Sequence, residues 1–326
     1  MTAGMKTSTI KKLLRNRIDA WLDTVKDTAL VEMLKKDTIV SGGAIASALA
    51  GDKINDYDLY FKTYSTALAV ASYYVDQFNT LNGIKVAPNG KSCSPAVKEM
   101  DRVNSKGISE KRIIIYMKSA GVAGEAQDEY KYFESQSEAS TEDFINSLKG
   151  DDEMKAAETV ADEVKSKTLP KYRPVFMSEN AVTLSDKVQL VIRFHGEPAE
   201  IHENYDYAHS MCYYTYGDDK LVCPAEALEC ILSKTLIYKG SLYPVASVFR
   251  LRKFIERGWR ITAGQVLKIL FQINSLDLKD PVVLREQLLG VDQAYMHQLL
   301  RALESKEAGT KVDATYLAKL IDEIFE

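Results

Sequence analysis

Hydrophobic residues along this chain follow two alternating spacings, one typical of helices and one typical of strands. Apolar side chains recur at three- and four-residue steps over residues 7–35, which predicts a helical N-terminal segment. Short β-branched or apolar runs then predict strands at 37–43, 56–62, 84–86, 112–117, 174–177, 181–184, 188–194 and 211–216. Among these runs, helices are predicted at 44–50 and at 65–79, the second capped by Ser65, with a short helix or turn at 198–204. From residue 224 to residue 326 the spacing is almost entirely helical.

This order of elements predicts an α+β protein in which a mixed-sheet domain is followed by an all-helical domain. A chain of 326 residues is long enough to form two domains. We expect an N-terminal helical segment at 1–36, the mixed-sheet domain at 37–222 and the helical domain at 223–326.

Charge is distributed unevenly along the chain. The 42 basic and 46 acidic residues give a formal net charge of −4, so the protein as a whole is not basic. Residues 125–167 hold thirteen acidic residues against five lysines, so this stretch alone carries −8. We therefore expect an acidic insertion at about 119–170, built from solvated helices or loop, with a lid or a partner-binding arm as the alternative.

The cysteines and the terminal residues bear on the compartment. Cys93, Cys212, Cys223 and Cys230 form no Cys-x-x-Cys pair and have no histidine cluster beside them, which favours reduced thiols over a zinc site. The chain has no run of 18 apolar residues, and its first residues lack the apolar core of a signal peptide. We expect a cytoplasmic protein without a membrane partner.

The segment from residue 38 to residue 61 carries the clearest chemical signal. A β-branched run ends at Gly42 and Gly43, and a short helical pattern follows. Asp56 and Asp58 then lie two residues apart on a second apolar strand, so their side chains point to the same face. Two adjacent carboxylates repel unless a cation lies between them, and a glycine turn that begins a helix favours phosphate. Together these features indicate phosphoryl or nucleotidyl transfer, whereas an ordinary solvated turn is the alternative.

This segment resembles the signature of the nucleotidyltransferase superfamily, the polymerase-β-like proteins that include poly(A) polymerases and tRNA CCA-adding enzymes. The signature is a Gly-Gly or Gly-Ser turn, about nine to thirteen residues, and then Asp-x-Asp or Asp-x-Glu between apolar residues. Val40, Gly42, Gly43, Asp56 and Asp58 occupy these places here. The resemblance implies a nucleotidyltransferase-like catalytic domain, a two-metal Mg²⁺ site on Asp56 and Asp58, and an NTP substrate whose phosphates contact Gly42, Gly43 and Ser41.

Two-metal transfer usually requires a third carboxylate. Asp206, which lies between aromatic residues just before the strand predicted at 211–216, is the best candidate for catalysis and metal binding. It resembles the Arg-Asp-Phe-Thr region of CCA-adding enzymes, although Asn204 and Tyr205 replace the arginines. Glu203 is the alternative ligand, and a capping or turn role for Asp206 is the other reading.

Basic residues concentrate over residues 231–260, where seven cations stand against Glu256 alone. Arg250, Lys253 and Arg257 share one helix face, so Arg250 and Lys253, together with Lys234, are candidate nucleotide-binding residues. A solvated basic surface is the alternative. Three histidines lie seven residues apart but have no cysteine partner at zinc spacing, so packing explains them better: His195, His202 and His209. A tyrosine cluster is also explained mainly by packing, although one member could stack on a base: Tyr205, Tyr207, Tyr213, Tyr214 and Tyr216.

These observations favour a Mg²⁺-dependent nucleotidyltransferase that moves a nucleoside monophosphate from an NTP to an acceptor hydroxyl and releases pyrophosphate. The acceptor suggested by the resemblance is an RNA 3′ end, such as that of tRNA. Three alternatives stay open: a transferase acting on a small molecule or a protein, a second-messenger synthase, and an inactive nucleotide-binding module.

Overall fold

The computed structural model describes residues 4–83, 94–103, 109–116, 121–123 and 170–278, together with residues 280, 283, 284 and 287. The strand predicted at 84–86 and most of the predicted acidic insertion lie outside these residues. None of the described helices is long and apolar enough to cross a membrane.

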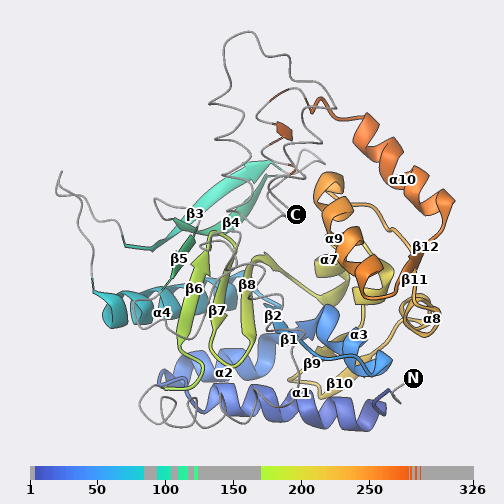
Figure 1. Ribbon diagram of the computed structural model, residues 1–326. Coiled ribbons are helices and arrows are strands. Elements are labelled where there is room, and N and C mark those ends of the chain that lie inside the picture. Colours follow the sequence, from blue (N-terminus) through green and yellow to red (C-terminus); the bar gives the residue numbers. More distant parts are fainter. Residues whose placement is uncertain are drawn as a thin grey trace, which may run out of the picture.

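An eight-stranded mixed sheet forms the centre of the molecule (Figure 1). Its strand order is β10-β9-β1-β2-β8-β7-β6-β5, and of its pairings only β2 with β8 is parallel. The strands are β1 (Thr38–Ser41), β2 (Tyr57–Phe61), β5 (Gly121–Ala123), β6 (Pro174–Ser178), β7 (Ala181–Leu184), β8 (Val188–His195), β9 (Tyr213–Thr215) and β10 (Lys220–Val222). The mixed α/β architecture predicted from the sequence is therefore confirmed.

The N-terminal segment is two helices, α1 (Thr7–Leu22) and α2 (Thr28–Asp37), so the prediction of one helical stretch misses a break. The break has a local cause, because the Asp27 carboxylate accepts hydrogen bonds from the backbone of Ala29 and Leu30 and starts α2. Similarly, Thr63 and not Ser65 caps helix α4 (Tyr64–Asn82).

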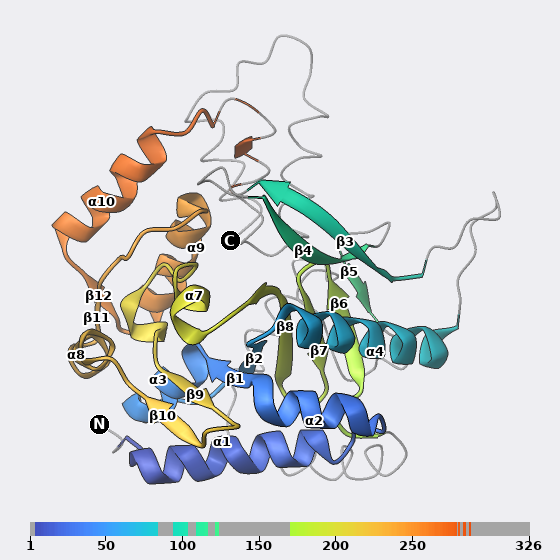
Figure 2. The same cartoon turned by 180° about the vertical axis from the view of Figure 1, so that it is seen from behind.

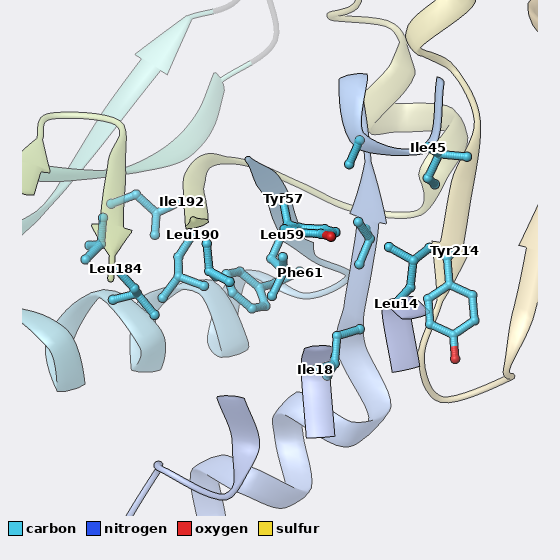
Figure 3. Packing of buried hydrophobic residues seen from close by; sticks show 14 of the residues in the cluster. Leu14, Ile18, Ile45, Tyr57, Leu59, Phe61, Leu184, Leu190, Ile192 and Tyr214 are labelled. Carbon is cyan, nitrogen blue, oxygen red and sulfur yellow. The ribbon is translucent and has the colours of Figure 1, made fainter. Parts of the chain in front are cut away.

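Helices α1, α2 and α4 cover one side of the sheet (Figure 2). Side chains from this side of the strands interlock with those of the helices (Figure 3). Leu59 and Phe61 of β2 are buried here at 1% and 0% exposure, and Tyr57 is buried beside them. The apolar half of β2 therefore fixes the strand, and its alternate residues must face the other side.

The other side of the sheet carries a smaller apolar group, Ile39, Tyr60 and Ile201. Ile201 comes from the short helix α7 (Pro198–His202), which was predicted as a helix or turn at 198–204. Strand β9 begins at Tyr213, two residues later than predicted, after a short 3-10 helix at Ala208–Ser210. This side holds the candidate site.

Two strands, β3 (Ala96–Val103) and β4 (Ser109–Tyr116), pair as a separate antiparallel hairpin. The polar composition of β3 hid this strand in the sequence pattern. Ile113 and Ile115 of β4 belong to the main core and Val97 of β3 packs against it, so both strands anchor the hairpin.

The C-terminal part contains α8 (Ala225–Ser233), α9 (Pro244–Glu256) and α10 (Ala263–Asn274), with α3 (Gly43–Ala50) beside α8. Two short parallel strands, β11 (Thr235–Leu236) and β12 (Arg260–Ile261), interrupt the helices, so this region is not all-helical. Its buried residues, among them Ile231, Leu251 and Trp259, belong to the same hydrophobic cluster as the sheet.

Candidate active site

The turn between β1 and α3 brings the glycine pair against the carboxylate pair. Ser41 of β1 lies directly opposite Asp58 of β2 in the antiparallel register. Gly42 follows with φ 95° and ψ −152°, a conformation that is essentially restricted to glycine. A Cβ at Gly42 would lie 3.0 Å from Asp58 Oδ2, so a side chain here would collide with the carboxylate. Gly43 then begins α3, and a Cβ on it would meet no atom within 4 Å.

Asp56 and Asp58 lie on the sheet side opposite the main core, as their spacing predicts. Burial raises the pKa of Asp58 well above its usual range, and the nearby charge of Asp56 raises it further. Although Asp56 is exposed at the rim of the site, crowding by protein atoms raises the pKa of its carboxyl group too. The two carboxylates are thus held together in surroundings that disfavour negative charge on both.

Three cations near Asp56 favour the ionised form of its carboxyl group. Arg257, Lys187 and Lys253 each lower its pKa by their positive charge, Arg257 most strongly. Lys253 was predicted as a site residue, whereas Lys187 was missed. Lys187 stands in the turn before β8, where its carbonyl accepts a hydrogen bond from Tyr57 N at 2.8 Å, so the parallel β2–β8 pairing brings it to the site. No local sequence signal reveals this pairing.

A buried polar layer lies behind Asp58. The Ser41 hydroxyl is fully buried, donates to the Cys212 carbonyl at 3.1 Å and lies 2.9 Å from His202 Nε2. A phosphate contact by Ser41 would therefore require this side chain to leave both partners. The Tyr205 hydroxyl also lies near the glycine turn, 3.7 Å from the position that a Cβ on Gly42 would take. That hydroxyl is buried beside the side chains of Ser41 and Tyr60.

Asp206 is engaged by a cation from α9. Arg250 Nε donates to Asp206 Oδ2 at 2.7 Å, and the aspartate side chain is 13% exposed. Lys234 similarly pairs with Asp52 at 3.2 Å. Among the described residues no group of three His, Cys, Asp or Glu side chains could hold a metal ion, so Asp206 does not complete a three-carboxylate cluster.

Two carboxylates nevertheless fit a single Mg²⁺. This ion keeps several water ligands and commonly binds one or two carboxylates together with substrate phosphates. Burial raises the pKa of both carboxyl groups despite the three cations near Asp56, so a bound cation would favour their ionised forms. The donor set therefore fits one hard divalent ion, whereas the arrangement with three carboxylates does not fit the described residues.

The glycine turn gives a first prediction. In Gly42→Ala, the alanine must adopt a φ that is unfavourable for it, and its Cβ comes close to the Asp58 carboxylate. We therefore expect this substitution to lower the free energy of unfolding by about 1–3 kcal/mol. Gly43→Ala is the matched control, because its Cβ has open space, and we expect a change within about 1 kcal/mol. Urea denaturation measures both, and equal losses in the two variants would contradict the geometry.

Two buried histidines give a second prediction. Burial lowers the pKa of His202 and of His209 from about 6.5 to about 4. Between these values the unfolded chain binds protons that the folded chain does not, so stability falls as the pH is lowered from about 6.5 to about 4. His202→Gln should make this fall shallower, as shown by urea denaturation at a series of pH values. His195→Gln, away from the site, is the control, and identical slopes in wild type and His202→Gln would disprove the assignment.

Comparison with known proteins gives one structural similarity and one family. A CCA-adding enzyme from Thermotoga maritima, solved in complex with tRNA, aligns with a TM-score of 0.35 and 11% identity. The alignment covers 94% of this chain and 66% of the enzyme, but a TM-score this low does not establish a shared fold. No curated protein matches the sequence. The model of the Gabija anti-defense 2 family matches residues 12–234, which is more than half of the chain. The protein therefore belongs to the Gabija anti-defense 2 (Gad2) family.

Proposed function

We propose that this Gad2-family protein is a Mg²⁺-dependent nucleotidyltransferase and that it opposes Gabija defence through this activity. The observation that carries the proposal is the contact between the glycine turn and the carboxylate pair. The β1–β2 register sets Gly42 against Asp58, with the N-terminus of α3 beside them. A helix N-terminus, which favours phosphate, beside two carboxylates, which could bind a cation, is the combination that we expect nucleotidyl transfer to use.

Each residue has a distinct part in the proposed reaction. Asp56 and Asp58 would hold Mg²⁺, which when bound offsets their charge and that of the NTP phosphates. The backbone at Gly43 and the first turn of α3 would receive phosphate oxygens. Lys253 and Arg257 face the rim of the same site and would hold further phosphate charge.

The transfer itself balances as follows. The acceptor oxygen bonds to the α-phosphorus of the NTP, the bond from that phosphorus to the bridging oxygen breaks, and pyrophosphate leaves. The hydroxyl proton passes to water. Asp206 would be a positioning residue, because its hydrogen bond with Arg250 holds α9 and thereby Lys253 and Arg257. A direct metal-binding role for Asp206 would need that bond to open.

The proposal also concerns the molecule that accepts the nucleotide. Cations on and after α9 favour an RNA 3′ end, because Arg252, Lys253, Arg257 and Arg260 lie close together in the chain. A hydroxyl on a protein or small molecule of the Gabija system is the alternative, which the family description favours. The second candidate function is an inactive nucleotide-binding module, favoured by the absence of a three-carboxylate cluster from the described residues.

A transfer assay tests the proposal. Each α-labelled NTP is incubated with Mg²⁺, the protein and a lysate of Gabija-expressing cells that retains its small RNAs. We expect label on a discrete acceptor, and we expect Asp56→Asn/Asp58→Asn to reduce it at least a hundredfold because the cation site is lost. Asp76→Asn, an exposed carboxylate on α4, is the matched control and should leave the labelling unchanged.

The location of the label separates the alternatives. Label on RNA, with binding that weakens steeply as salt rises, supports the RNA acceptor. Label on a protein or small molecule supports the alternative acceptor. Mg²⁺-dependent NTP binding without transfer to anything would replace the enzyme by the inactive module.

A further inference from the structure

A cavity of about 330 Å³ lies beside the candidate site, between α3 and the end of α9. Its size is within the range of small-ligand sites. Its lining comes from four places in the chain: the first turns of α3, the loop leading to Asp56, the 3-10 helix Ala208–Ser210, and the segment from α9 to β12. The lining residues used below are Gly43, Asn55, His209, Phe254, Arg257 and Trp259.

One end of this cavity is polar and adjoins the carboxylates. Gly43 is the first residue of α3, and Asn55 directly precedes Asp56. Arg257 lines the cavity and is also the strongest of the cations that act on Asp56. A phosphate chain bound at Asp56 and Asp58 would therefore have positive charge and a helix N-terminus beside it within this cavity.

The other wall is aromatic. The ring of His209 lies 4.4 Å from Trp259 and 4.5 Å from Phe254, measured between ring centroids. Trp259 is 7% exposed and His209 only 2%. Aromatic rings lining the same cavity as Gly43 and Arg257 suit a planar heteroaromatic ligand, since any nucleobase can stack on aromatic side chains.

His209 adds a polar group that has no partner. Its Nε2 lies 3.3 Å from the Ser210 hydroxyl, whereas its Nδ1 is buried without a hydrogen-bond partner in the described residues. An unpaired buried nitrogen costs free energy comparable to a lost hydrogen bond. A ligand that forms a hydrogen bond with His209 Nδ1 would therefore bind more tightly than a ligand that cannot.

We infer that this cavity is the nucleobase subsite of the enzyme and that His209 Nδ1, by pairing with the edge of the base, is a specificity-determining atom. The inference rests on the proposed function and deepens it. Trp259 and Phe254 form the apolar wall against the base, and Arg257 spans the distance between the base and the phosphates. Of these four residues, the sequence pointed only to Arg257, as part of a basic helix face that could bind phosphate.

Fluorescence tests the subsite directly, because the chain has two tryptophans and the other, Trp21, is fully buried in the main core. The probes are the four NTPs as α,β-non-hydrolysable analogues, and inorganic triphosphate, each with Mg²⁺. We expect NTP analogues to change the tryptophan emission, with one or two bases bound more tightly than the others. Inorganic triphosphate should bind without that change, and Trp259→Phe should abolish the change.

His209→Phe tests the specificity atom while keeping an aromatic ring in place. We expect it to weaken binding of the preferred analogue about three- to tenfold, as loss of one hydrogen bond implies, and to level the four affinities. Triphosphate binding should be unaffected, which shows that the variant is folded. His195→Phe, whose ring contacts Tyr64 away from the cavity, is the matched control.

The outcomes separate this inference from the proposed function. NTP binding and transfer that persist without any change in Trp259 emission, or with unaltered base preference in His209→Phe, would overturn the subsite and leave the transferase standing. Triphosphate and NTP analogues that both fail to bind would count against the transferase itself, and with it the subsite.

Discussion

The two carboxylates at the start of strand β2 set the main constraint on this protein. Sheet pairing fixes Asp58 opposite Ser41, and burial together with Asp56 raises the Asp58 pKa. Like charges held side by side in surroundings of low polarity repel, so ionising both carboxyl groups costs free energy. Under the proposed function, a bound cation offsets this repulsion.

The surrounding structure makes that arrangement rigid. The glycine turn admits the Asp58 carboxylate because only glycine adopts the φ of 95° at Gly42 without strain and leaves room for it. Behind Asp58, Ser41 and His202 form a buried polar contact that ties β1 to α7. From the other direction, the ion pair of Asp206 with Arg250 holds α9 so that its basic face meets Asp56. The sheet, the turn and α9 thus converge on one point from distant parts of the chain.

Sequence reasoning reaches the parts of this site that are local in the chain. The spacing of Gly42, Gly43, Asp56 and Asp58 depends on one strand, one turn and one helix, and the alternation along β2 is visible in its apolar residues. The contacts between residues far apart in the chain could not be predicted in this way. Lys187 reaches Asp56 only through the parallel pairing of β2 with β8, and nothing in its own neighbourhood indicates that pairing. The buried state of Ser41 likewise depends on Cys212, which is 171 positions away. In the same way, Asp27 breaks the first helix by a capping contact that apolar spacing does not register.

The central claim is that Asp56 and Asp58 together form a divalent cation site. Electron paramagnetic resonance of Mn²⁺, used in place of Mg²⁺, measures this most directly, because bound and free Mn²⁺ give distinct signals. The account predicts that the wild-type protein and Asp76→Asn bind Mn²⁺ in the presence of a non-hydrolysable NTP analogue, and that Asp56→Asn and Asp58→Asn each weaken this binding at least tenfold. Equal Mn²⁺ binding by wild type and both site variants would contradict it.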